Sequence, residues 1–286
     1  MKERPPGVEK KAAGRPRGEV LLYVVTAILT GFAGSLVAGM FGIGGASVTT
    51  PALRLALGAS PAIALGTTLP VIIPTALSGA LTYLRRGRLD VRASLLCCAS
   101  GLAGSGVGAL LTRWMDLHYL MLVTGAVVLY FASLTVYRGL TGKIEGEEVK
   151  GGPSAERRAS GDSPAWLILS IGLAAGVFSG LLGLGGGTIM IPAFMYLLGM
   201  PIRKAFGTSL AAIALIAVPG TLIHALLGHV SWTLVLLLSI GSVPGAYLGA
   251  RLALKTKEPI LYVMFGLLFA LFGVSFIVNE IIGMLG

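Results

Sequence analysis

The stretch GMFGIGGASVTTPALRLALG at residues 39–58 and its counterpart GLLGLGGGTIMIPAFMYLLG at residues 180–199 decide the fold. Each contains a glycine-rich break and then about 12 mostly apolar residues, too few to cross a ~30 Å hydrocarbon core as one helix. A chain in lipid cannot leave backbone groups without partners unless they face protein, water or a ligand. Each stretch is therefore predicted to form a break and a short re-entrant half-helix, which enters the membrane and returns.

The two stretches belong to an internal repeat. A gapless shift that places Gly39 on Gly180 aligns residues 31–112 with residues 172–253. Identical residues recur across three apolar runs and the loops between them, which chance similarity of glycine-rich helices explains poorly. The chain is therefore predicted to contain two sequence-related halves.

The composition indicates an all-α integral membrane protein. Of the 286 residues, 55% are hydrophobic and 12% are charged, far from the average of soluble domains. Runs of about 20 apolar residues can each cross the membrane as a helix. We predict eight such spans, at residues 20–40, 62–84, 91–112, 118–137, 165–182, 204–227, 231–253 and 259–283.

The predicted organisation has four parts. A basic cytoplasmic tail covers residues 1–19, and the first transmembrane repeat covers residues 20–138. A polar linker of mixed charge covers residues 139–164, and its composition is typical of a solvated connector. The second transmembrane repeat covers residues 165–286.

The net charge of +10 is expected to orient the chain in the plasma membrane, and no nucleic-acid partner is predicted. In an eight-span chain, the cations of the tail, of the loop between the second and third spans, and of the region after the fourth span fall on one side, which predicts a cytoplasmic N-terminus. The second half carries cations on the other side. An odd number of crossings in one half would invert the halves and remove this conflict. We favour eight spans at this stage. The conflicting cations are Arg203, Lys204, Arg251, Lys255 and Lys257.

The N-terminus of each half-helix is the predicted binding site for a small anion. Its backbone N–H groups have no intrahelical partner, and the helix dipole adds partial positive charge. Matching interruptions in two halves are also where transporters place a midplane site. Alternatively, the glycines only permit close helix packing. The predicted contacts are Gly44, Gly45, Ala46 and Ser47 in the first half, and Gly185, Gly186, Gly187 and Thr188 in the second.

Hydroxyl groups at the start of the following spans are further candidates. They could contact the anion or cap their own helices. These residues are Thr67, Thr68, Thr208 and Ser209.

Two ionisable residues could add charge to the site. Arg54 could attract the anion or extend to the interface, and His224 could contact a proton or the substrate, or lie at the interface. No Asp or Glu occupies a span centre, so a buried acidic proton relay is not predicted. The span centres also lack a metal-ligand cluster and a Ser/His/acid set, so we predict no enzyme, metal or other cofactor.

The doubled pattern G-x-x-G-[IL]-G-G-[AG], followed by proline, Leu-Gly and A-[LF]-G-T-[TS]-L, resembles the TauE/SafE sulfite exporter family. The similarity covers nearly all of both halves, although Ala46 stands where a third glycine is usual. The resemblance implies a secondary membrane transporter of small sulfur-containing anions such as sulfite, thiosulfate or organosulfonates.

The direction and the alternatives follow from simple energetics. An inside-negative membrane potential drives an anion outward without a coupling ion, so we predict an exporter. An anion channel and a transporter of a non-sulfur organic anion are the alternatives. The expected partners are the small anion and membrane lipids, and the sequence is compatible with a homo-oligomer.

Overall fold

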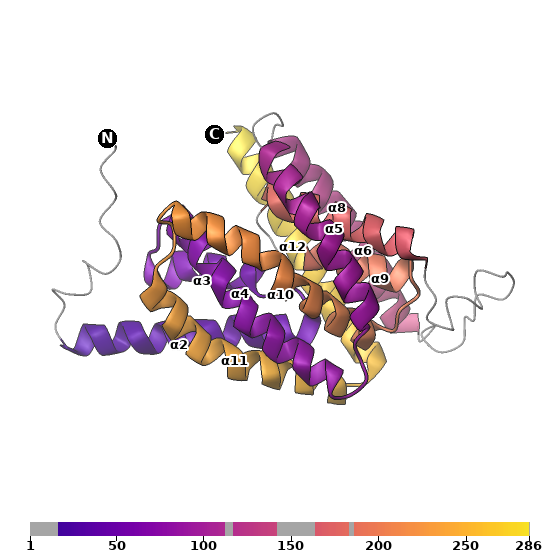
Figure 1. Ribbon diagram of the computed structural model, residues 1–286, viewed down its shortest axis with the longest axis horizontal. Coiled ribbons are helices and arrows are strands. Elements are labelled where there is room, and N and C mark those ends of the chain that lie inside the picture. The colour runs from indigo at the N-terminus through magenta and orange to yellow at the C-terminus, as the bar shows by residue number, and fades with distance from the viewer. Residues whose placement is uncertain (1–16, 112–116, 142–163, 183–185, 286) are drawn as a thin grey trace, which may run out of the picture. The chain divides into compact units, whose positions relative to one another are not determined.

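The computed structural model describes residues 17–111, 117–141, 164–182 and 186–285, and within these ranges all regular structure is helical (Figure 1). This confirms the prediction of a helical membrane protein. Ten helices are described: α2 (Arg17–Phe41), α3 (Ala46–Leu57), α4 (Pro61–Leu84), α5 (Val91–Leu111), α6 (Leu117–Thr141), α8 (Ala165–Leu182), α9 (Gly187–Tyr196), α10 (Ile202–Leu226), α11 (Trp232–Lys255) and α12 (Glu258–Leu285).

Six of the described helices are long and apolar enough to cross a membrane. They coincide with six of the eight predicted spans, so the count of eight is not confirmed. Shorter apolar segments lie at Ala165–Ser179 in α8 and at Gly187–Tyr196, which is α9. The six candidates are Gly18–Phe41, Gly66–Leu84, Val91–Gly108, Ile202–Leu226, Trp232–Lys255 and Glu258–Ser275.

The helices of the second half begin at a constant offset from those of the first. Helices α3, α4, α5 and α6 begin at residues 46, 61, 91 and 117, and helices α9 to α12 begin at 187, 202, 232 and 258. Each offset equals the one that places Gly39 on Gly180 in the sequence. The repeat in the sequence is therefore also a repeat in where helices begin.

The chain forms two compact units, and each contains helices from both halves of the sequence. The first unit consists of Met1–Leu89 and Gly207–Leu252, so it holds α2, α3 and α4 with most of α10 and α11. The second consists of Asp90–Phe206 and Ala253–Gly286, so it holds α5, α6, α8, α9 and α12. Packing within each unit therefore interleaves the two halves.

In the first unit, α2 and α11 pack in parallel through glycines of α11. Gly245 lies against the backbone of Phe32, and Gly249 lies against the backbone of Leu36. A Cβ on either glycine would collide with the facing carbonyl group. The two helices run in the same direction because both residue numbers rise together.

The second unit contains the equivalent interface between α5 and α8. Gly104 lies against the backbone of Leu173, and Gly108 lies against the backbone of Val177. The repeat relates Gly104 to Gly245 and relates Leu173 to Phe32. Without a hydrophobic effect between lipid-exposed helices, such small residues allow the close backbone approach that stabilises the pair.

Helix α3 carries the chain from one end of α2 back to the other. The Ser35 and Thr75 hydroxyls are 3.3 Å apart, and the Tyr83 hydroxyl donates to the Met40 carbonyl at 3.1 Å, so α4 runs parallel to α2. Thr75 of α4 lies beside Ser35 of α2, so in two parallel helices each residue of α4 lies beside the residue of α2 that is 40 positions earlier. The start of α4, Pro61, is therefore level with Leu21, near the start of α2. The chain therefore returns over about 30 Å between α2 and α4, which is the hydrocarbon thickness. The predicted re-entrant course is wrong for α3.

Helices that correspond under the repeat run in opposite directions. In the first unit, α4 and α10 are antiparallel: a Cβ on Gly79 would lie 2.8 Å from Leu210, and a Cβ on Gly220 would lie 3.5 Å from Leu69.

In the second unit, α6 and α12 are also antiparallel. A Cβ on Gly266 would lie 2.5 Å from Val136, and a Cβ on Gly273 would lie 2.6 Å from Leu129. The contact further along α12 is made with a residue earlier in α6, so the two helices run in opposite directions, as α4 and α10 do.

An ion pair in the second unit contradicts the eight-span arrangement directly. Lys204 Nζ lies 3.0 Å from Asp90 Oδ2. Eight spans with re-entrant half-helices would place Asp90 and Lys204 on opposite sides of the membrane. The ion pair therefore requires the ends of α4 and of the loop before α10 to lie at the same level.

Candidate functional site

The first predicted half-site lies in the first unit, at the N-terminus of α3. Gly44 and Gly45 have φ angles of 81° and 90°, a left-handed backbone region that favours glycine. Gly45 is the N-cap of α3, and no side chain caps this end. Its carbonyl accepts the Val48 and Thr49 N–H groups at 3.1 and 2.8 Å. The N–H groups of the first two helical residues point away from the helix body and have no intrahelical acceptor.

Three helices enclose this break. A Cβ on Gly44 would lie 2.9 Å from Ile213 Cγ2 of α10. A Cβ on Gly45 would lie 3.3 Å from Ala38 of α2 and 3.9 Å from Thr75 of α4. The break is therefore buried inside the first unit, where a free N–H group costs more than it would in water.

Three of the buried hydroxyl groups near the break already donate their protons. Ser209 Oγ donates to the Gly42 carbonyl at 2.7 Å. Thr75 Oγ1 donates to the Val71 carbonyl at 2.7 Å, so Ser35 must be the donor in its contact with Thr75. Ser209 and Thr75 therefore have no proton left for an anion, whereas the backbone N–H groups at the start of α3 have no intrahelical acceptor.

Of the hydroxyl residues predicted at the following spans, only Ser209 contacts the first break in the described hydrogen bonds. Thr67 accepts the Ser231 N–H at 3.1 Å, and Thr68 lies 3.2 Å from Thr50. Thr67 is eight residues before Thr75, about 12 Å along α4, so it belongs to another level of the helix. Thr208 is fully buried beside Ser209 in α10.

The second predicted half-site lies in the second unit. Helix α9 begins at Gly187 after Gly186, and again no side chain caps this end. Gly186, Gly187 and Thr188 are buried, and a Cβ on Gly186 would lie 2.9 Å from the Ala175 carbonyl oxygen. Gly186 has a φ of −45°, so the two breaks differ in backbone conformation. Gly185 and the side chains of Ala46 and Ser47 lie outside the described part of the chain.

The two ionisable candidates lie away from the N-terminus of α3. Arg54 is exposed in the last turn of α3. His224 lies in the last turn of α10, where its ring centre is 5.5 Å from that of His229. Neither residue supplies charge to the buried break.

Tyr83 is a buried polar residue beside the end of α2 that was not among the residues predicted from the sequence. It is fully buried, and its hydroxyl lies 3.3 Å from the Gly39 carbonyl and 3.1 Å from the Met40 carbonyl. It therefore satisfies carbonyl groups at the end of α2, where the chain leaves the helix for the break. The signal available was positional: Tyr83 is the repeat counterpart of His224, and both are polar residues near a span end.

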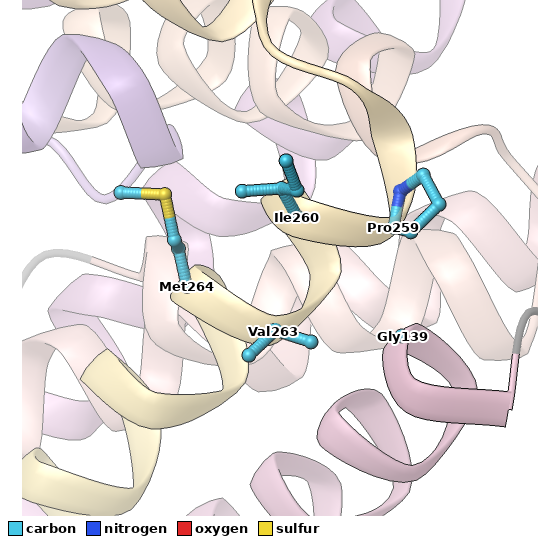
Figure 2. Close-up of a pocket in the computed structure, with 5 residues that line it drawn as sticks. All are labelled: Gly139, Pro259, Ile260, Val263 and Met264. Carbon is cyan, nitrogen blue, oxygen red and sulfur yellow. The ribbon is translucent and has the colours of Figure 1, made fainter.

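A shallow groove on the second unit is not a candidate for anion binding. It has a volume of about 220 Å³ and is lined by one residue of α6 and four of α12 (Figure 2). No charged or hydroxyl side chain lines it, so it offers an anion no donor. The lining residues are Gly139, Pro259, Ile260, Val263 and Met264.

Within the described ranges, no group of three or more His, Cys, Asp or Glu side chains is arranged to hold a metal ion. The two cysteines, Cys97 and Cys98, are buried and free. The arrangement that stands out is therefore an uncapped, buried helix N-terminus.

Comparison with known proteins places the chain in a family. The sequence profile of the family described as "Sulfite exporter TauE/SafE" matches residues 27–276. The chain belongs to the TauE/SafE family. The match includes both glycine-rich breaks and all ten described helices in whole or in part.

Curated relatives of the chain carry transporter names. The chain is 29% identical over 244 residues to "Probable membrane transporter protein YunE" of Bacillus subtilis, covering 81% of this chain and 86% of that protein. It is 30% identical over 224 residues to YdhB of the same organism, covering 78% and 88%. It is 30% identical over 242 residues to YfcA of Escherichia coli K12, covering 85% and 82%. No solved structure matches the chain significantly. TauE/SafE membership and these relatives identify a multi-pass membrane transporter.

Proposed function

We propose that this transporter exports small sulfur-containing anions, such as sulfite, thiosulfate or organosulfonates, across the plasma membrane. The name of the matching family supports the sulfur chemistry. Each unit would offer one anion-binding position, at the N-terminus of α3 in the first unit and at the N-terminus of α9 in the second. The contacts of the anion would be the N–H groups of Gly44, Gly45, Ala46 and Ser47 in the first break, and those of Gly185, Gly186, Gly187 and Thr188 in the second.

The uncapped N-terminus of α3 inside the first unit carries the proposal. Glycines at 44 and 45 leave the backbone accessible, and the hydroxyl protons of Ser209 and Thr75 are donated elsewhere. Backbone N–H groups aligned with a helix dipole bind an oxyanion without a charged side chain.

The energetics favour export. An inside-negative potential moves a monovalent anion outward with about 2.3 kcal/mol per 100 mV. None of the acidic residues in the described spans lies at a span centre, so no carboxylate is available there as a coupling site. Uniport down the electrical gradient is therefore the simplest mechanism.

We further propose that the two halves are inverted repeats, each passing through the membrane five times. The antiparallel pairs α4 with α10 and α6 with α12 support this topology, as does the parallel course of α2 and α4. Helices α3 and α9 are too short to cross lipid alone, but a short helix and irregular backbone are tolerated where protein surrounds them.

The charges then select the orientation. With five passes in each half, 14 of the 22 Lys and Arg residues fall on the side opposite the N-terminus. The positive-inside rule makes that side cytoplasmic, so the N-terminus lies outside. This proposal reverses the cytoplasmic N-terminus expected from eight spans, and it removes the charge conflict of the second half.

Substitution of Gly45 by alanine tests the site. The left-handed φ of 90° and the 3.3 Å approach to Ala38 oppose a side chain there. We expect an alanine to raise the free energy of this backbone conformation by about 1–2 kcal/mol. The conformation that binds the anion is then less populated, so anion binding should be roughly five- to thirtyfold weaker. Efflux of sulfite and thiosulfate from proteoliposomes with an imposed potential measures the effect, with sulfate and chloride as competing anions.

Gly106 supplies the matched control. It lies in α5, and a Cβ added to it would meet no atom within 4 Å, so G106A should transport like the native protein. Equal loss of flux in G45A and G106A would reject the site. Absence of sulfite and thiosulfate flux through the folded native protein would reject the substrate class.

A further inference from the structure

The turn between α10 and α11 holds two of the chain's three histidines against each other. His224 and His229 have ring centres 5.5 Å apart with an interplanar angle of 52°. Both rings are partly exposed, yet both Nδ1 atoms are buried without a hydrogen-bond partner among the described residues. Such groups in a native structure call for an explanation, because burying a ring nitrogen without a partner is costly.

The backbone holds this pair in a defined geometry. Gly228 N–H donates to the Ala225 carbonyl at 3.1 Å, and His229 N–H donates to the His224 carbonyl at 3.0 Å. With Gly228 at a φ of 71°, these bonds form a Schellman motif. In this motif the third-last helical residue, here His224, contacts the second residue beyond the cap, here His229. The backbone therefore brings the two side chains together.

Contacts with α4 fix the same turn. Ser231 N–H donates to Thr67 Oγ1 at 3.1 Å, and the His229 carbonyl lies against Gly66. The backbone that carries both imidazoles is therefore fixed by the Schellman motif and by α4, as a preorganised ligand pair requires.

The equivalent turn in the first half shows that the fold does not require histidines at these two positions. Helix α4 ends in the same motif, with Gly87 at a φ of 65° and Arg88 N–H donating to the Tyr83 carbonyl at 2.9 Å. Tyr83 and Arg88 occupy the positions equivalent to His224 and His229. This position of a Schellman motif commonly holds an apolar contact, so two imidazoles are specific to the second half.

We propose that His224 and His229 chelate one divalent transition-metal ion of the zinc, nickel or copper type. Imidazole is the protein ligand that suits these ions. With metal–nitrogen distances of about 2.0–2.1 Å, the two ring centres would lie roughly 5 Å apart at a tetrahedral angle. The observed 5.5 Å is close to this separation. Ser231 Oγ, also buried without a partner among the described residues, is the nearest oxygen donor in sequence, and water would complete the shell.

Cu²⁺ titration of the detergent-purified full chain, isolated through a histidine-free tag, tests the proposal. We expect one bound ion per chain and an electron paramagnetic resonance spectrum with nitrogen ligation. Affinity should fall in the order Cu²⁺ above Ni²⁺, with no competition from Mg²⁺. H224F and H229F keep an apolar ring contact and should each bind at least about tenfold more weakly, since even supporting residues of metal sites contribute that much.

The third histidine supplies the control. H118A should bind Cu²⁺ like the native chain, and thermal unfolding without metal should report that H224F and H229F remain folded. Absence of nitrogen-ligated Cu²⁺ in the native chain would overturn the proposal. Unchanged Cu²⁺ affinity in folded H224F and H229F would overturn it as well.

Discussion

Asp90 has two structural roles at the first turn of α5. Its Oδ1 accepts the Ala93 N–H at 3.0 Å, and its Oδ2 pairs with Lys204 Nζ at 3.0 Å. Burial by itself raises the pKa of Asp90. The hydrogen bond from Ala93, the hydrogen bond and charge of Lys204, and the charge of Arg92 together outweigh burial and hold the pKa below its ordinary value. The carboxylate form therefore stabilises the folded state.

Two substitutions separate these roles. D90N keeps a capping oxygen but loses the charge, so the free energy of unfolding should fall by up to about 1 kcal/mol. D90A loses the cap as well and should lose about 1 kcal/mol more. Denaturant unfolding in micelles at neutral pH measures both. Identical stabilities of D90N and D90A would show that the cap contributes nothing.

The pH dependence has a defined sign. A carboxyl with a lowered folded pKa stabilises the protein above its unfolded pKa of about 3.9, and it loses this contribution as the pH falls through the folded pKa. The difference in stability between the native protein and D90N should therefore be constant from neutral pH to about pH 5 and shrink below it. A difference that grows on acidification would contradict this assignment.

At the scale of helices, the glycine contacts make a paired prediction on α5. Gly108 lies against the backbone of Val177, whereas Gly106 has open space around it. G108L should destabilise the second unit by about 1–3 kcal/mol through overpacking, and G106L should be neutral because its side chain meets lipid. Thermal unfolding of the two variants, which carry the same substitution two positions apart, measures the difference. Equal midpoints would show that α5 and α8 do not pack through Gly108.

The positions of the long helices in the sequence could be predicted well. The directions in which neighbouring helices run could not. The eight predicted spans each match a described helix within a few residues, because apolar length is a direct property of the sequence. Hydropathy carries no information on whether a 12-residue helix returns or passes through. That depends on neighbours such as Ser35 and Thr75, which fix α4 parallel to α2.

The candidate site was predictable only in part, for a similar reason. Gly44 and Gly45 could be identified because the glycine-rich break recurs in both halves, and the structure has a positive φ at both, which favours glycine. The hydrogen bond of Ser209 to Gly42 joins residues 167 positions apart, and no local pattern encodes it. Tyr83 was missed for the same reason.

For the whole molecule, labelling of single cysteines tests the topology. In a background without Cys97 and Cys98, we expect R86C and P201C to react alike with a membrane-impermeant maleimide and L227C to react oppositely. The reason is that Asp90 pairs with Lys204, which fixes the loops before α5 and α10 on one side. In intact cells, L227C should be the labelled variant.

Eight spans make a different prediction for the same cysteines. They would place residues 86 and 227 on one side and residue 201 on the other. Matching reactivity of R86C and L227C would therefore overturn the inverted topology. Labelling of R86C and P201C from outside, with L227C protected, would keep the topology and reverse the orientation.

The parallel contact of α2 with α11 also governs how the protein is made. Gly31 lies against Leu238, which the ribosome adds much later. At about 5–20 residues per second, α2 waits roughly 10–40 s in the membrane before its partner is synthesised. The second unit is likewise incomplete until α12 is added. Pairs such as α5 with α8 can form earlier, but each unit becomes complete only within the last fifth of synthesis, when α11 and α12 are added.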